Sequence, residues 1–233
     1  MNNHRAFIQI TDEIANYFNF IAQAGFKEFD CSEKTIEMID KWGKPDVVPV
    51  ETLAALHAES NNCQRCNLWQ NRQTIVFGDG NPHARLVFIG EAPGMDEDRQ
   101  GLPFVGAAGQ LLTRIIQAMK LKREDVYICN IIKCHPPQNR NPLPEEINAC
   151  APFLKRQIKA IQPDYICTLG AFATQTILQT DRQISHLRGR FHSYEGIQVM
   201  PTFHPAFLLR NPGKKRDVWE DMQKLMRMLA IET

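Results

Sequence analysis

Four residues that could act together on a ligand fall at the ends of strand-like stretches or on the loops between them: Glu91, Phe104, Asn130 and His204. They offer a carboxylate, an aromatic face, an amide that both donates and accepts hydrogen bonds, and an imidazole. This set fits a flat heterocycle that stacks on the ring while the amide contacts its polar edge. Each residue alone also has a structural explanation: a helix cap, a core aromatic, a backbone partner and a loop histidine. The hypothesis therefore requires all four in one pocket.

A second group of residues suits metal ligation. Cys63 and Cys66 have C-x-x-C spacing, and Cys134 and Cys150 follow, with Cys134 beside prolines in a poor setting for a core residue. Thiolates so placed suit zinc or an iron–sulfur cluster. A zinc ribbon would offer two close C-x-x-C pairs, so the spread of the second pair over a loop and a helix favours the cluster. The alternative is four cysteines scattered through the core.

The total cysteine count points to a reducing compartment. The chain has seven cysteines, an odd number that suits metal ligation better than a disulfide framework. Cys129 and Cys167 lie inside apolar strands, where core packing is their expected role. The sequence shows neither a secretory signal nor an apolar run of membrane-spanning length. We therefore expect a soluble cytoplasmic protein with no membrane partner.

Strands and helices alternate around these residues. Apolar runs predict strands at 85–89, 126–132, 164–169 and 197–203, and helical spacing predicts helices at 51–60, 110–120, 171–179 and 215–231, with another from 144. Such alternation predicts a parallel sheet covered on both faces. The expected fold is α/β, a three-layer α/β/α sandwich with a central, mainly parallel four-stranded sheet. Ligands bind at the carboxyl ends of strands in such sheets.

Residues 1–50 are expected to form a helical N-terminal extension. Apolar residues from Phe7 to Ile21 recur at steps of three and four, Gly25 could end that helix, and 43–49 is typical of a linker. A packing or partner-binding role is the plain interpretation, because no chemistry is evident there. A second domain would then occupy 51–233.

Positive charge is concentrated late in the chain. The net charge is only +1, yet residues 182–216 hold seven Lys or Arg and one acidic residue. A basic region on a nearly neutral protein suggests a local anionic partner. A solvated surface explains the charge equally well.

The motifs, taken in order, resemble those of the family-4 uracil-DNA glycosylases, the iron–sulfur type of bacteria and archaea. The matching segments are 90–94, 97–98, 101–106, 130–137, 139–140, 144–150 and 204–206, within a region from about 50 to 231. The chain departs from the family at His135, where Arg is common, and at Ala206, where Ser is common. These departures could weaken a backbone contact and change a phosphate or loop hydrogen bond.

The resemblance implies a DNA repair enzyme that flips uracil out of DNA and hydrolyses its N-glycosidic bond, with 51–233 as the catalytic domain. It implies a structural 4Fe–4S cluster held by Cys63, Cys66, Cys134 and Cys150. The implied uracil contacts are Glu91, Ala92, Pro93, Phe104, Asn130 and His204. His204 is expected to stabilise the departing base, and Glu91 to position or polarise water.

The expected partner is uracil-containing DNA, single- or double-stranded, bound by a monomer. The residues expected to contact DNA are Phe207, Leu208, Arg210, Lys214, Lys215 and Arg216.

An alternative is a non-catalytic nucleic-acid-binding protein of repair or replication with a structural iron–sulfur cluster. Such a protein would keep the cysteines and the basic region but would not need Phe104, Asn130 and His204 in one pocket. A nucleotide-binding enzyme is disfavoured, because neither GxxxxGK nor GxGxxG follows a strand.

Overall fold

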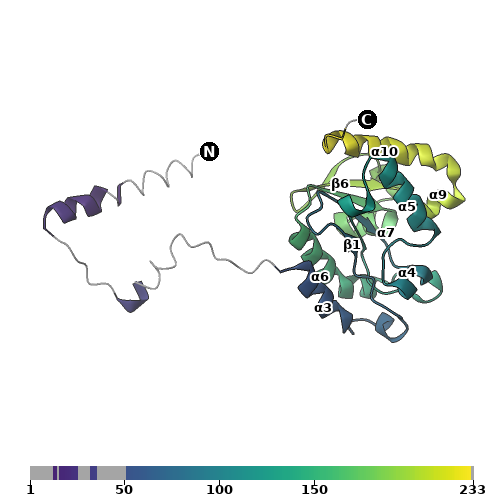
Figure 1. Cartoon of the computed structure of the whole chain (residues 1–233), viewed down its shortest axis with the longest axis horizontal. Helices are drawn as coiled ribbons and strands as arrows, with labels where there is room; N and C mark the ends of the chain where they lie inside the picture. Colours follow the sequence, from purple (N-terminus) through teal and green to yellow (C-terminus); the bar gives the residue numbers. More distant parts are fainter. Residues whose placement is uncertain (1–12, 15, 26–31, 36–50, 232–233) are drawn as a thin grey trace. The chain divides into compact units, whose positions relative to one another are not determined.

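The computed structural model of the chain describes residues 13–14, 16–25, 32–35 and 51–231 (Figure 1). The chain divides into two units, Met1–Pro49 and Val50–Thr233. In the first unit, residues 16–23 are helical and Gly25 follows with a φ of 93°. The predicted helix start near Phe7 and the linker at 43–49 lie outside the described residues.

A six-stranded sheet forms the centre of the second unit (Figure 1). The strands are β1 (Asp79–Gly80), β2 (Leu86–Gly90), β3 (Tyr127–Asn130), β4 (Tyr165–Leu169), β5 (His192–Tyr194) and β6 (Ile197–Thr202), in the order β1-β3-β2-β4-β6-β5. The central strands β3, β2, β4 and β6 are parallel, and β1 and β5 pair antiparallel at the two edges.

The predicted four-stranded sheet is therefore corrected to a mixed six-stranded one. The four parallel strands correspond to the predicted ones. The two additional strands have only two and three residues, and none of these is fully buried. Segments this short carry no apolar alternation, so hydrophobic periodicity does not reveal them.

Helices cover both faces of the sheet. One face packs against α3 (Leu53–Asn61), α6 (Pro144–Ile161) and α7 (Ala171–Leu178), and the other against α5 (Ala107–Ala118) and α10 (Lys215–Met228). In Figure 1, α10 lies at one end of the folded unit, opposite α3 and α6. Val87 and Ile89 of β2 enter one core, while Leu86 and Phe88 enter the other. Burial on both faces is typical of a central parallel strand.

Two short helices begin just beyond the carboxyl ends of strands. These are α4 (Met95–Gln100) after β2 and α9 (Pro205–Arg210) after β6. The remaining short elements are η1 (Asn67–Gln70), η2 (Arg123–Asp125), η3 (Pro137–Asn139), α8 (Ile184–Leu187) and η4 (Pro212–Lys214). Because the central strands are parallel, their carboxyl ends and the loops that follow lie at one edge of the sheet.

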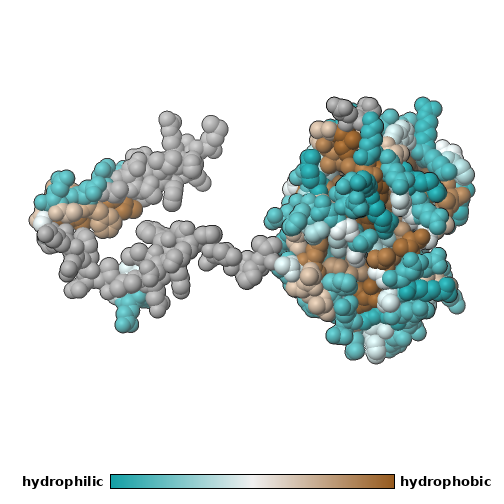
Figure 2. Space-filling model, viewed as in Figure 1, coloured by the Kyte–Doolittle hydropathy of each residue, from teal (hydrophilic) through white to brown (hydrophobic). Residues whose placement is uncertain are grey.

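The surface of the second unit in view is mostly hydrophilic, with hydrophobic residues in separate patches (Figure 2). Among the residues that the structure describes, none of the helices combines the length and apolar character needed to cross a membrane.

Candidate active site

One cavity of about 390 Å³ opens at the carboxyl ends of the parallel strands. Its lining includes every residue predicted to contact the heterocycle: Glu91, Ala92, Pro93, Phe104, Asn130 and His204. These residues come from four separate parts of the chain. The structure therefore brings together the side chains that the sequence analysis required in one pocket.

Gly90, the last residue of β2, allows Phe104 and Asn130 to approach each other. A Cβ atom at this position would collide with Asn130 Oδ1 and with the Phe104 ring, so a glycine is needed here. The Phe104 ring lies 5.7 Å from the His204 ring, with 33° between the two planes. Phe104 itself has a φ of 53°, a conformation that costs energy for a residue other than glycine.

Glu97 holds the loop of Phe104 against the turn that follows β2. Its Oε1 accepts hydrogen bonds from the backbone N–H groups of Val105 (2.8 Å) and Gly106 (3.0 Å), and its Oε2 accepts from Gly94 (3.0 Å). The sequence pattern did not predict this role of Glu97. Its place three residues after the N-cap of α4 is a capping-box signal for the bond to Gly94. The bonds to the Phe104 loop had no sequence signal.

Asn130 presents an unpaired acceptor. The residue is 1% exposed, and its Oδ1 has no hydrogen-bond partner among the described residues. Its surroundings are fixed, because the N–H of Ile131 donates to Gly90 O at 2.9 Å. A buried acceptor without a partner costs about 1–3 kcal/mol. A ligand N–H group in the cavity would satisfy it.

His204 offers a hydrogen-bond donor. It is the N-cap of α9, and its Nδ1 accepts a hydrogen bond from Ala206 N–H at 3.1 Å. A neutral ring that accepts at Nδ1 carries its proton on Nε2. Burial, helped by the nearby Arg210 guanidinium, lowers the pKa of His204 to about 4. At neutral pH the imidazole is therefore uncharged and donates through Nε2.

The turn after β2 carries a partly buried carboxylate, that of Glu91. Burial raises the pKa of Glu91. The Nδ1–H of His135 donates to Pro93 O at 2.9 Å. The family that the chain resembles commonly has Arg at the position of His135. His135 nevertheless contacts the backbone of this turn.

The residues predicted to contact DNA occupy different environments. Phe207 and Arg210 line the cavity, while Lys214, Lys215 and Arg216 are exposed. Two of these cations have carboxylate partners: Lys214 pairs with Asp217 at 3.0 Å and Arg216 with Glu220 at 3.2 Å.

The expectation for Leu208 is corrected by its burial. Leu208 is 1% exposed and belongs to the core between the sheet, α5 and α10. An apolar side chain packed in this way is not available to DNA. Its neighbour Leu209 is 42% exposed and presents an apolar side chain to solvent.

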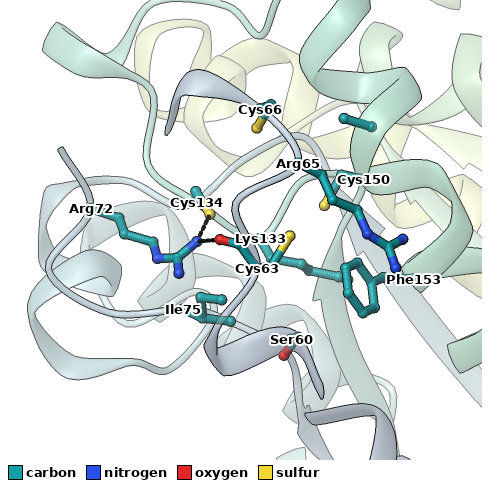
Figure 3. Close-up of a pocket in the computed structure, with 11 residues that line it drawn as sticks. Ser60, Cys63, Arg65, Cys66, Arg72, Ile75, Lys133, Cys134, Cys150 and Phe153 are labelled. Carbon is teal, nitrogen blue, oxygen red and sulfur yellow. Dashed lines mark hydrogen bonds between the residues drawn. The ribbon is translucent and has the colours of Figure 1, made fainter. Parts of the chain in front are cut away.

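The four cysteines predicted to ligate a metal line a second cavity: Cys63, Cys66, Cys134 and Cys150 (Figure 3). In Figure 3 they surround one hollow. Arg72 donates to Cys134 Sγ at 3.4 Å and to the backbone oxygen of Cys63 at 2.8 Å. The set fits an iron–sulfur cluster, because four soft thiol ligands converge from separate elements.

The other cysteines that the structure describes have core roles. Cys129 in β3 and Cys167 in β4 are buried among apolar side chains, as predicted. Neither lines the cavity of the four cysteines, and none of the described cysteines forms a disulfide.

An ion pair links the candidate active site to the helix of Cys150. Arg140 lines the active-site cavity and donates to both carboxylate oxygens of Glu146, at 2.9 and 2.6 Å. Glu146 lies one turn before Cys150 in α6 and also accepts from Leu143 N–H at 2.8 Å. This ion pair was not predictable from the sequence, because the separation of two residues along the chain does not reveal a bidentate contact.

Comparisons with known proteins agree with this geometry. The model of the uracil DNA glycosylase superfamily matches residues 77–223. Over 186 residues, the chain is 45% identical to a type-4 uracil-DNA glycosylase of Thermotoga maritima, covering 78% of this chain and 97% of that protein.

Two archaeal relatives are similarly close. The identity is 43% to a type-4 uracil-DNA glycosylase of Saccharolobus solfataricus, covering 78% of this chain and 88% of that protein. It is 42% to one of Archaeoglobus fulgidus, covering 76% of this chain and 92% of that protein. The chain belongs to the uracil DNA glycosylase superfamily, as a member of its type-4 family.

Proposed function

We propose that this protein excises uracil from DNA by hydrolysing the N-glycosidic bond, leaving an abasic site for repair. The observation that carries this proposal is the single cavity in which the Phe104 ring, the unpaired Asn130 Oδ1 and the neutral His204 imidazole lie together. The proposal is supported by relatives that are named as type-4 uracil-DNA glycosylases.

Uracil would be recognised by its plane and by one edge. The base stacks on Phe104, and Asn130 Oδ1 accepts a hydrogen bond from the uracil N3–H. Cytosine offers an acceptor at that nitrogen, so it would leave Asn130 Oδ1 unpaired and facing another acceptor. A site built to pair with a polar group rejects an analogue lacking that group, because the buried partner stays unsatisfied.

Cleavage would be aided by stabilising the departing base. As the bond breaks, positive charge develops on the sugar and negative charge on uracil. The Nε2–H of His204 donates to a uracil carbonyl oxygen as that charge grows, and such donors strengthen most in the transition state. Glu91, the half-buried carboxylate at the cavity wall, positions or polarises the attacking water.

The four cysteines Cys63, Cys66, Cys134 and Cys150 would hold a 4Fe–4S cluster. When bound, the cluster would join the loop that contains the C-x-x-C pair to the segment after β3 and to α6. This role is structural, because the cysteines line a different cavity from the one that would receive the base.

Residues 51–233 form the catalytic domain, residues 1–50 an extension, and the protein acts as a monomer in the cytoplasm of a bacterium or archaeon. DNA backbone contacts come from Arg210, Lys214, Lys215 and Arg216, which are exposed, with Phe207 close to the displaced base.

A single-turnover assay tests the function. Purified protein is incubated with a labelled oligonucleotide carrying one uracil, and abasic sites are revealed by alkali. We expect cleavage at the uracil, and none in matched oligonucleotides with cytosine or thymine there. Protein that carries its cluster and binds the oligonucleotide but creates no abasic site would instead support a non-catalytic accessory role.

A further inference from the structure

Lys133 is a buried lysine between the two cavities. It is 2% exposed, and its side chain helps to line the cysteine cavity (Figure 3). Asn130, three residues earlier, lines the candidate active site. Lysine is almost never fully buried unless its charge has a partner. The position of Lys133 therefore needs an explanation that core packing does not supply.

The contacts of Lys133 satisfy only part of its side chain. Its Nζ donates to the backbone oxygen of Asn130 at 2.7 Å, interacts with the thiol of Cys129 and lies 5.9 Å from the centre of the Phe77 ring. An ammonium has three donors. Within the described part of the chain, no carboxylate lies within ion-pair distance of Lys133.

The neighbours that could balance this charge are the cysteines. Four thiolates around an iron–sulfur cluster give the site a net negative charge, which helps to set its reduction potential. The desolvation cost of a buried cation is offset when an opposite charge lies beside it. Arg72, which donates to Cys134 Sγ at 3.4 Å, is a second cation at the same cavity. Both cations suit an anionic group held there.

We propose that Lys133 is a positioning residue that balances the charge of the thiolate-bound cluster and, through its bond to the Asn130 backbone, fixes the amide that reads uracil. This inference rests on the proposed cluster and the proposed uracil site. The connection is short, because Lys133 precedes the ligand Cys134 directly and contacts Asn130 O. Loss of the cluster or of the ammonium would then loosen the uracil-reading residue.

Three variants isolate the charge of Lys133. Lys133→Met removes the charge but keeps a long apolar chain, and Lys133→Arg restores a charge. Lys159→Met is the matched control, because Lys159 is an exposed lysine on α6, the helix that carries Cys150. All proteins are purified anaerobically, and their iron content, rate of iron loss to a chelator and cluster reduction potential are measured.

Removing a nearby positive charge makes a cluster harder to reduce. We expect Lys133→Met to shift the potential to a more negative value and to lose iron about tenfold faster than wild type. Lys133→Arg should recover most of the potential, and Lys159→Met should match wild type. A wild-type potential and wild-type iron retention in Lys133→Met would overturn the proposal.

Hydrogen exchange tests the connection to Asn130. In cluster-loaded Lys133→Met, we expect amides of residues 127–133 to exchange faster than in wild type, while residues 192–194 of the distant edge strand β5 stay unchanged. Unchanged exchange at 127–133 would overturn the coupling. Should Lys133→Met fail to fold, Lys133→Gln keeps a donor but no charge, and an unshifted potential there would overturn the charge-balancing role.

The wild-type protein separates this inference from the proposed function. Wild type without iron or without uracil excision would contradict the proposed function. Wild type with both, beside a Lys133→Met protein that matches it in potential and exchange, would remove only the role of Lys133.

Discussion

The candidate active site and the cysteine cavity share the segment 130–136 but differ in how their polar groups are paired. In the active site, Asn130 Oδ1 has no partner among the described residues, and His204, whose Nδ1 already accepts from Ala206 N–H, lines the cavity. In the cysteine cavity, Arg72 already donates hydrogen bonds to Cys134 Sγ and to the backbone oxygen of Cys63. Unpaired hydrogen-bond donors and acceptors suit a substrate that binds reversibly, whereas converging thiols suit a permanently bound prosthetic group.

Because the two cavities differ in this way, we expect substitutions in them to have different effects. Changes in the active site should reduce chemistry and leave the iron content intact. Changes in the cysteine cavity should release iron and lower stability. Lys133 is the exception, because we propose that it connects the two cavities. Elsewhere, a substitution that lowers both excision and iron content would show that the two cavities are not functionally distinct.

The largest effect is expected for His204→Ala. Losing a donor that stabilises a developing negative charge costs about 10²–10³-fold in rate, so single-turnover uracil excision should fall by that factor. Affinity for the uracil oligonucleotide and iron per chain should stay near wild type. The matched control is His186→Ala, an exposed histidine outside the cavity. Equal losses in excision and DNA binding would contradict the role.

Cys134→Ser tests the expected behaviour of the cysteine cavity. Replacing a thiolate ligand should weaken cluster retention by more than the about 10–100-fold that is typical for loss of an outer-shell partner, and should lower the thermal midpoint. Cys167→Ala is the control, because Cys167 is buried in β4 and does not line the cavity. Iron per chain and visible absorbance provide the measurement. Full iron retention in Cys134→Ser would remove this residue from the ligand set.

The depressed pKa of His204 predicts a pH effect on stability. The unfolded imidazole binds a proton near pH 6.5, whereas the folded one stays neutral down to about pH 4. The unfolded state therefore holds more protons between these values, and stability falls as pH falls. We expect about 2 kcal/mol of this loss between pH 7 and pH 5.

Urea unfolding of wild type and His204→Gln at the two pH values measures this contribution. The loss attributed to His204 should be missing from the variant. The same pH dependence in both proteins would show that the imidazole is not held neutral by its surroundings.

A smaller effect is expected for Asn130→Asp. A carboxylate keeps an acceptor for the uracil N3–H but places a second acceptor where the amide NH₂ stood, and we expect a buried acceptor without a partner to cost about 1–3 kcal/mol. Uracil excision should fall about tenfold, and the preference for uracil over cytosine should narrow. Asn141→Asp is the control, because Asn141 lines the same cavity but is exposed. An unchanged base preference in Asn130→Asp would count against its reading role.

Much of the fold was predictable because long apolar runs encode it. The central strands β2, β3, β4 and β6 coincide with predicted runs, since strands buried on both faces need continuous apolar sequence. The edge strands were missed because their pairing depends on neighbours rather than on their own sequence.

The residues of the candidate site were predictable from their types and spacing, but the contacts between them were not. Chemistry and spacing singled out Phe104, Asn130 and His204, yet the bonds from Glu97 to the Phe104 loop required the structure. The burial of Lys133 is the clearest example of a feature that the sequence does not predict. Lysine is normally exposed, so nothing in the sequence alone places its ammonium inside the protein.

A crystal structure of the protein with a uracil-containing oligonucleotide tests the central claim most directly. The account predicts that the base lies in the strand-end cavity, stacked on Phe104, with its N3–H on Asn130 Oδ1 and a carbonyl oxygen on His204 Nε2. A base bound elsewhere, or one in the cavity that leaves Asn130 Oδ1 unpaired, would contradict it.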